Sequence, residues 1–126
     1  FEKAKVIFEK LSKNNSLYRN TIVNLGIALL NTGDAKGAAG MFLSALKNNE
    51  NDLLALNNLA SIFFMAKNFK RAEELYQRAL SLDRRDPRLF RVLVQVFRAQ
   101  GKDDEAERLL SYGKKMHPNS PLLADL

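Results

Sequence analysis

The sequence of 126 residues has no cysteine, no tryptophan, a single histidine and only three prolines. Without cysteine there is no disulfide, no thiol nucleophile and no thiolate ligand for a metal. The lone His117 cannot form a multi-histidine metal site, and no serine and aspartate stand at a spacing that would make it catalytic. No glycine-rich phosphate loop is present either. These absences argue against an enzyme, and we expect no catalytic residue, no metal site and no cofactor in this chain.

Long hydrophobic runs and blocks of like charge are also missing. No apolar stretch approaches the ~20 residues that span a bilayer, and no signal peptide is visible. The net charge of +6 is spread evenly, because the ranges 1–52, 53–86 and 87–126 each carry +2. Evenly mixed charge is typical of a solvated helical surface rather than of a nucleic-acid site. The hydrophobic fraction of 46% is high enough for a packed core.

What the sequence does contain is an internal repeat of 34 residues. The ranges 19–52, 53–86 and 87–120 align without a gap, and the same residue types recur in the same columns. Two columns hold small residues, one holds leucine and two hold large apolar residues. These columns are Ala38, Ala72 and Ala106; Ala45, Ala79 and Gly113; Leu25, Leu59 and Leu93; Leu29, Phe63 and Phe97; and Phe42, Tyr76 and Leu110. The spacing of the apolar residues is helical, so each repeat is predicted to be a helix, a turn and a second helix.

Cap and turn residues repeat at the predicted boundaries. Asp52, Asp86 and Ser120 each precede a new helix and can accept hydrogen bonds from its first N–H groups. Pro87 and Pro121 follow two of these caps, at a position where a helix tolerates proline. The turns inside the repeats are expected at Gly33-Asp34, Lys67-Asn68 and Gly101-Lys102.

These columns resemble the tetratricopeptide repeat (TPR), whose pattern is large-x2-Leu-small-x2-aromatic followed by Ala-x3-aromatic. The middle copy shows every one of these positions: Leu56, Leu59, Ala60, Phe63, Ala72 and Tyr76. The chain departs from the pattern in four places. The first large column has no tryptophan, and Lys67 replaces the usual turn glycine. Glu50 and Arg84 replace the late proline, and Val94 is bulky for the small-residue column. We expect Val94 to hold the two helices of its repeat slightly apart.

The resemblance implies an all-α fold, a right-handed α-solenoid of antiparallel helix pairs, and it covers nearly the whole chain. The ranges 19–52, 53–86 and 87–120 would be complete TPR units. Residues 1–18 match the second helix of a preceding repeat, with Ala4 and Phe8 in its columns, and residues 121–126 match the start of a following helix. We therefore expect the chain to be an excerpt of a longer TPR protein. Its ends would expose apolar surface and favour stacking with another copy.

Two adjacent asparagines interrupt the apolar run of the helix predicted from Leu53. Asparagine forms helices poorly, so Asn57 and Asn58 need a reason to be there. At about 100° per residue, Asn58 lies opposite the apolar face, and Asn57 lies between the two sides. The residues that share the side of Asn58 are Leu54, Ser61 and Met65. A plain surface helix would carry lysine and glutamate there.

Asparagine recurs in the same column one repeat earlier. There Asn24 takes the place of Asn58, and its neighbours on that side are Asn20, Ile27 and Asn31. The resemblance implies that this side of each first helix lines a concave groove, where several family members hold a ligand backbone through asparagine. An amide can pair with a peptide N–H and a peptide C=O together, whatever the ligand's side chains.

The third repeat is basic on the same side, where Arg88, Arg91, Gln95 and Arg98 lie. Arginine binds carboxylates in a bidentate way, so this end is predicted to receive acidic residues. The chain is thus predicted to be a non-catalytic module that binds an extended peptide or partner segment. The candidate peptide-binding residues are Asn20, Asn24, Ile27, Asn31, Leu54, Asn57, Asn58, Ser61, Met65, Arg88, Arg91 and Gln95.

Other interpretations stay open. The asparagines could be merely solvated, Arg91 and Arg98 could only cover the surface with their aliphatic stems, and Arg84-Arg85 is interpreted as a solvated turn. The array could instead be a scaffold that stacks through its ends. RNA-binding helical repeats have a period of about 35 residues, and this sequence shows no basic stripe with stacking aromatics. A clamp for chaperone carboxylates fits Asn58 and Arg88 but not the positions of Val23, Ile27 and Val92.

Overall fold

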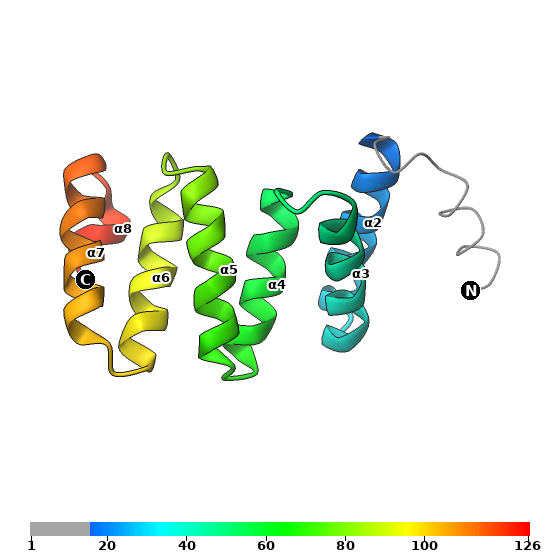
Figure 1. Cartoon of the computed structure of the whole chain (residues 1–126), viewed down its shortest axis with the longest axis horizontal. Helices are drawn as coiled ribbons and strands as arrows, with labels where there is room; N and C mark the ends of the chain where they lie inside the picture. Colours follow the sequence, from blue (N-terminus) through cyan, green and yellow to red (C-terminus); the bar gives the residue numbers. More distant parts are fainter. Residues whose placement is uncertain (1–15) are drawn as a thin grey trace. The chain divides into compact units, whose positions relative to one another are not determined.

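Helices make up all the regular structure in residues 16–126, the part of the chain that the computed structural model describes (Figure 1). They are α2 (Ser16–Asn31), α3 (Ala35–Asn48), α4 (Leu53–Met65), α5 (Phe69–Leu82), α6 (Pro87–Ala99), α7 (Asp103–Met116) and α8 (Pro121–Ala124). They follow one another as antiparallel pairs, so the predicted all-α fold of paired helices is confirmed. The helix predicted for the range 1–18, with Ala4 and Phe8, lies mostly outside the described residues, and α2 begins at Ser16.

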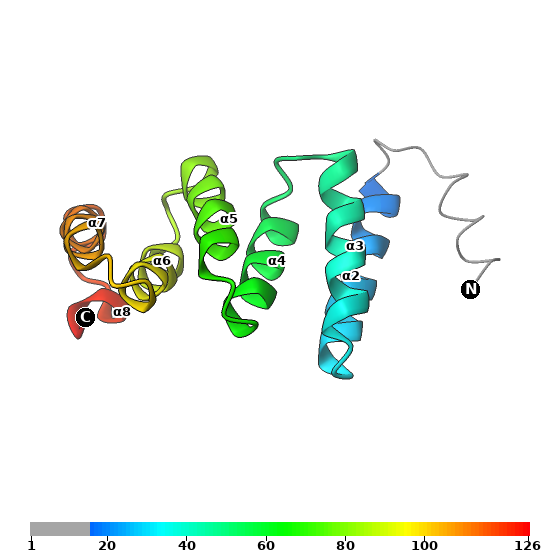
Figure 2. The same ribbon diagram turned by 60° about the horizontal axis from the view of Figure 1, so that its bottom comes forward.

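The chain divides into two compact units, Phe1–Asn58 and Leu59–Leu126, with the boundary inside α4. In the first unit, α2 packs against α3. In the second unit, α6 packs against both α5 and α7, and the short α8 contacts α6 and α7. Figure 2 shows α8 beside these two helices. Within residues 16–126, no helix is both long and apolar enough to cross a bilayer.

Small residues bring the two helices of the first unit close together. Ala38, Phe42 and Ala45 of α3 are buried. Opposite them, Gly26 of α2 leaves room for the Phe42 ring, because a Cβ on Gly26 would lie only 2.8 Å from Cε1 of that ring. Full burial of a phenylalanine side chain stabilises a fold by about 1.5–3 kcal/mol. The small-residue column predicted from the sequence therefore serves close helix packing.

The turn inside each repeat has the same geometry three times. Gly33, Lys67 and Gly101 have φ angles of 87°, 64° and 75°, in the left-handed region. The next residue in each turn donates its backbone N–H to the carbonyl five residues earlier, at 2.8, 2.8 and 2.9 Å. This is the Schellman arrangement that ends a helix. The predicted turns are confirmed, and Lys67 adopts the conformation that glycine adopts in the other two.

Side chains then start the second helix of two repeats. Asp34 Oδ1 accepts from the N–H of Gly37 at 2.8 Å, and Asn68 Oδ1 accepts from the N–H of Arg71 at 3.4 Å. Lys102 takes this place before α7 and offers no side-chain acceptor. The acidic residues Asp103, Asp104 and Glu105 occupy the first turn of α7 instead, where they complement the helix dipole.

Two of the three caps predicted between repeats form a side-chain hydrogen bond. Asp52 Oδ1 accepts from the N–H of Ala55 at 3.2 Å, and Asp86 Oδ1 accepts from the N–H of Arg88 at 2.9 Å. Ser120 stands at the N-cap position of α8 without a side-chain hydrogen bond. A backbone bond from the N–H of Leu123 to the Ser120 carbonyl, at 3.4 Å, closes the first turn there.

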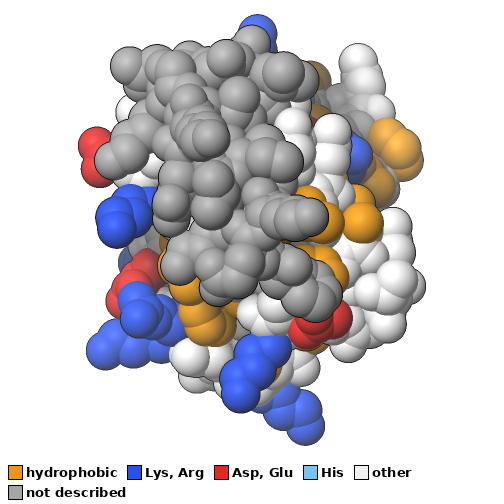
Figure 3. Space-filling view, turned by 90° about the vertical axis from the view of Figure 1, so that its right-hand side faces the viewer, with side chains coloured by type: hydrophobic (Ala, Val, Ile, Leu, Met, Phe, Trp, Pro, Cys, Tyr) orange, Lys and Arg blue, Asp and Glu red, His pale blue; other side chains and the backbone are white. Residues whose placement is uncertain are grey.

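The apolar core of the second unit is centred on α6, whose buried residues are Leu89, Phe90, Leu93, Val94, Val96 and Phe97. The leucine column differs between the units, since Leu93 is 2% exposed whereas Leu25 is 37% exposed. Leu93 is flanked by α5, the second helix of the preceding repeat. The corresponding helix for Leu25 was predicted in residues 1–18. Figure 3, viewed from the side on which α2 lies, shows hydrophobic side chains reaching the surface of the described residues.

Candidate functional site

Amide side chains form an exposed stripe along α2. Asn20, Asn24 and Asn31 are exposed and Ile27 is half-buried, while Ile22 and Val23 on the opposite side are buried. The spacing of i, i+4, i+7 and i+11 places the four stripe residues in one line on a helix. None of the three amides forms a hydrogen bond within the part of the chain that the structure describes. We call these four residues the amide stripe; all of them were predicted to contact a ligand.

Helix α4 carries a second line at the same spacing, made of Leu54, Asn58, Ser61 and Met65. Leu54 is 51% exposed and Met65 is 66% exposed, so both apolar ends of the line meet solvent. Asn58 does not leave its whole amide free. Its Nδ2 donates to the carbonyl of Leu54 at 2.8 Å, one turn back in the same helix. This local bond is a reason for an asparagine inside a helix that the sequence did not reveal.

Asn57 lies off this line and is half-buried. Its Oδ1 is fully buried and has no hydrogen-bond partner among residues 16–126. A buried acceptor without a partner costs about 1–3 kcal/mol, so Asn57 is not an ordinary solvated residue. Because solvent does not reach Oδ1, a ligand could approach Asn57 only through its Nδ2 group.

Ser61 is tied to the second helix of its repeat. It forms a hydrogen bond with Tyr76, which is 6% exposed in α5. Burial raises the pKa of the Tyr76 phenol, and the bond with Ser61 lowers it by a smaller amount. The phenol is therefore neutral at physiological pH and linked to the candidate surface through one hydroxyl.

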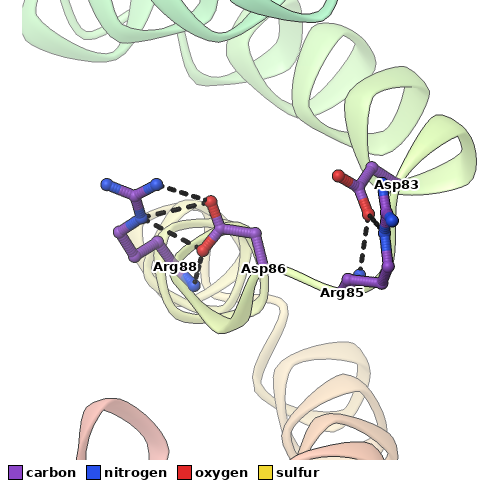
Figure 4. Close-up of polar contacts among 4 residues, drawn as sticks. All are labelled: Asp83, Arg85, Asp86 and Arg88. Carbon is purple, nitrogen blue, oxygen red and sulfur yellow. Dashed lines mark hydrogen bonds and ion pairs between the residues drawn. The ribbon is translucent and has the colours of Figure 1, made fainter.

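Two arginines at the junction of the second and third repeats fold back onto aspartates beside them (Figure 4). Arg88 Nη2 lies 2.8 Å from Asp86 Oδ2, and Arg88 Nε lies 3.0 Å from Asp86 Oδ1. Arg85 Nε lies 3.0 Å from Asp83 Oδ1. The bonds from these guanidinium groups hold the pKa values of both aspartates below their usual range. Arg88 remains 79% exposed, so part of its guanidinium still faces solvent.

The next two arginines on α6 hold the end of the described chain. Arg91 Nη1 donates to the carbonyl of Leu122 at 2.6 Å and lies 3.2 Å from Asp125 Oδ1. Arg98 Nη2 donates to the carbonyl of Leu126 at 2.9 Å and to Glu107 Oε1 at 3.1 Å. Arg91 thus already binds a backbone carbonyl and a carboxylate of an apolar, acidic segment. Gln95, between them on α6, is half-buried.

Sequence reasoning missed a cleft in the second unit. It lies between α5 and α7, has a volume of about 280 Å³, and exposes Arg84 and Tyr112 at its edge. The signal for it was Arg84, which replaces the usual turn residue and was interpreted as solvated. His117, the lone histidine, contributes here too, since its Nε2 lies 2.8 Å from the carbonyl oxygen of Arg84. In residues 16–126 no group of three or more His, Asp or Glu side chains could hold a metal ion.

Two family models match this chain, and both are described as Tetratricopeptide repeat. One matches residues 23–89 and the other residues 63–126, so each covers more than half of the chain. Among curated proteins, the chain is 37% identical over 70 residues to the uncharacterized protein ycf37 of Pyropia yezoensis, which covers 56% of this chain and 39% of that protein. It is 31% identical over 83 residues to anaphase-promoting complex subunit 3 of Schizosaccharomyces pombe, covering 66% of this chain and 12% of that protein. The chain therefore spans less than half the length of either relative.

Several solved structures have the same fold. The CopN-Scc3 complex gives a TM-score of 0.80 at 17% identity, covering 90% of this chain and 66% of that one. The first TPR of Spaghetti (RPAP3), bound to the HSP90 peptide SRMEEVD, gives 0.75 at 19% identity, covering 88% and 90%. YrrB, described as a TPR protein with an unusual peptide-binding site, gives 0.73 at 18% identity, covering 93% and 58%. At these identities the likeness shows the fold alone.

TPR units are non-catalytic modules that bind proteins and peptides. The helix pairs, the turn that recurs every 34 residues and the two family matches lead to one conclusion. The chain belongs to the tetratricopeptide-repeat family.

Proposed function

We propose that this chain binds an extended partner segment along the exposed lines of its first helices, with asparagine amides on the segment's backbone. The observation that carries the proposal is the amide stripe of α2. Three exposed asparagines stand in one line there, and none of them has a hydrogen bond within residues 16–126. Free amides offer both a donor and an acceptor to a peptide backbone.

The line on α4 supplies apolar and polar contacts to the same kind of ligand. Leu54 and Met65 expose large apolar side chains, which suit a ligand with hydrophobic residues. Asn58 keeps its Oδ1 and one N–H, since Leu54 takes the other N–H. Asn24 is therefore the more versatile of the two amides that the sequence placed in one column.

The arginines of α6 would receive the acidic part of the segment. Arg88 is mostly exposed, although Asp86 already neutralises it in part. Arg91 contacts a backbone carbonyl and a carboxylate at the same time, which are the two groups that an acidic peptide offers. This contact within the chain supports a role for Arg91 in binding acidic segments.

The test is affinity capture with the wild-type chain and with the Asn24→Ala/Asn58→Ala variant, compared by mass spectrometry. Binding of a captured partner is then measured by calorimetry. Each lost amide contact costs about 1 kcal/mol, so the double variant should bind about tenfold or more weakly. Its melting temperature should stay that of the wild type.

The matched control is Asn51→Ala, which removes an exposed asparagine from the loop before α4, outside both lines. It should capture the same partners with unchanged affinity. If the double variant captured the wild-type set with the same affinity as the control, the proposed role of the asparagines would be wrong.

A further inference from the structure

The cleft between α5 and α7 has an apolar floor inside the second unit. Leu80 of α5, Leu93 and Phe97 of α6, and Leu109 of α7 line it. The first three are at least 92% buried by packing within the fold, so they form a fixed surface rather than a mobile one. None of the residues predicted to bind a peptide from the sequence lines this cleft. Its lining therefore shares no residue with the candidate peptide-binding set.

The edge of the cleft is held in place by Arg84 and Tyr112. Arg84 Nη1 donates to the Tyr112 hydroxyl at 3.2 Å, and its guanidinium carbon lies 5.9 Å from the centre of the Tyr112 ring. The Tyr112 ring is 5.8 Å from the ring of buried Phe90. The backbone of Arg84 is fixed by His117 at its carbonyl. A cation and a 43% exposed aromatic ring are thus positioned side by side before any ligand arrives.

The charge around Tyr112 is positive and unneutralised. A second, shallower hollow of about 330 Å³ adjoins the cleft at Tyr112 and is lined by Arg108 and Lys115 of α7. Within residues 16–126, no carboxylate forms an ion pair with Arg84, Arg108 or Lys115. The one acidic residue lining the second hollow, Glu107, lies 3.1 Å from Arg98.

Some other cations of this unit are paired with carboxylates inside the fold. Arg85, Arg88 and Lys102 each lie within 3.0 Å of an aspartate or glutamate oxygen. Cations that remain without a counter-charge beside an apolar hollow leave a complementary place for carboxylates. At this cleft, cations that form no ion pair within residues 16–126 and a hydrophobic surface lie side by side.

We propose that this cleft is a second protein-binding site, for an acidic segment that places one large apolar side chain on the floor. A carboxylate next to that side chain would pair with Arg84, and further acidic residues would meet Arg108 and Lys115. Arginine suits this role because its fork binds a carboxylate in two bonds, and its place on Tyr112 keeps the fork oriented. A nucleic acid would leave the largely aliphatic floor unused, because bases stack on aromatic faces.

The experiment uses the whole chain, labelled with ¹⁵N, and a short peptide with leucine and phenylalanine flanked by glutamates. Titration followed by NMR should shift the backbone amides of Ser81, Leu109 and Tyr112. Arg84→Glu should weaken binding about tenfold or more, because it replaces attraction by repulsion, and Arg84→Gln should weaken it less. A peptide with serine in place of both apolar residues should bind more weakly than the parent peptide.

The matched control is Lys114→Glu, which makes the same change of charge on α7 outside both hollows. It should change the affinity less than about twofold, because only screened long-range charge is altered. The Asn24→Ala/Asn58→Ala variant should bind this peptide like the wild type. This result would distinguish the cleft from the proposed function, because the proposed function is tested by variants of other residues.

Several outcomes would overturn the second site. They are no binding at about 1 mM peptide, equal loss in the Arg84 and Lys114 variants, or shifts on α2 and α4 instead of α5 and α7. Tighter binding of a single-stranded oligonucleotide at the same amides would assign the cleft to nucleic acid. Self-association that disappears in Arg84→Glu, without peptide binding, would assign it to a second copy of the chain.

Discussion

A Cβ atom added to Gly113 would lie 2.9 Å from Cδ1 of Phe90, closer than two carbon atoms pack. Gly113 is buried in α7, and Phe90 is fully buried in α6. In the same two columns the middle repeat has Leu56 and Ala79. The larger Phe90 in one column therefore coincides with the smaller Gly113 in the other.

Gly113→Ala is expected to destabilise the second unit, although alanine favours a helix. Alanine gains about 1 kcal/mol over glycine inside a helix, whereas overpacking a rigid core costs about 1–3 kcal/mol. The expected net loss is therefore up to about 2 kcal/mol in the free energy of unfolding, measured by urea denaturation. Gly40→Ala in α3 is the control, because nothing lies within 4 Å of the added Cβ there. It should gain stability from the same change.

Phe90→Leu combined with Gly113→Ala restores the residue types of the middle repeat. The double variant should be more stable than the sum of the two single changes predicts, with a coupling of about 0.5 kcal/mol or more. Additive effects would show that the two residues do not constrain one another.

Lys67→Gly is expected to stabilise the turn between α4 and α5. Lys67 has a φ of 64°, and a residue with a Cβ loses about 1–2 kcal/mol in this conformation. Glycine avoids that cost but loses about 0.5–1 kcal/mol more backbone entropy on folding, which leaves a gain of about 0.5–1 kcal/mol. The melting temperature should rise by about 2–4 °C. Lys70→Gly, within α5, should lower it, because helical backbone gains nothing from glycine.

Asp86→Asn is expected to flatten the loss of stability in acid. The guanidinium of Arg88 lowers the pKa of Asp86 in the folded chain. A lowered pKa means that the carboxylate stabilises the fold above its unfolded pKa, and that this contribution is lost as pH falls through the folded pKa. The window therefore lies below about pH 4. Asparagine keeps an oxygen for the cap but has no charge to titrate.

Urea unfolding at pH 7, 4 and 3 measures this difference. The wild type should lose stability more steeply below pH 4 than Asp86→Asn does. Glu74→Gln removes one carboxylate from an exposed position past the first turn of α5. Glu74 forms no ion pair within the described residues, so this variant should keep the wild-type slope. Equal slopes for the wild type and Asp86→Asn would show that the Arg88 pair does not couple to folding.

The helix pairs and turns could be predicted from the sequence because they depend on local chemistry repeated at a fixed distance. Gly33 and Gly101 mark turns by their conformational freedom, and the equal spacing extends the prediction to Lys67. The amide stripe could be predicted as well, because helical periodicity alone puts Asn20, Asn24 and Asn31 on one line.

Side-chain partners were beyond the sequence. Nothing in the order of residues decides that Asn58 turns back to its own helix, since the amide has several rotamers of similar energy. The Arg84–Tyr112 contact joins residues 28 positions apart, and it depends on how α7 packs. Leu25 matches the leucine column, yet it is 37% exposed whereas Leu93 in the same column is 2% exposed, so a place in the column does not by itself decide burial.

Arg91 binds the backbone carbonyl of Leu122 in α8, and Arg98 binds that of Leu126 just after it, whereas Leu123 alone is fully buried there. Carbonyls are the same in every amino acid, so this junction tolerates wide sequence variation provided one leucine-sized anchor is kept. We therefore expect that α8 could be replaced by the first helix of another repeat without redesigning α6 or α7.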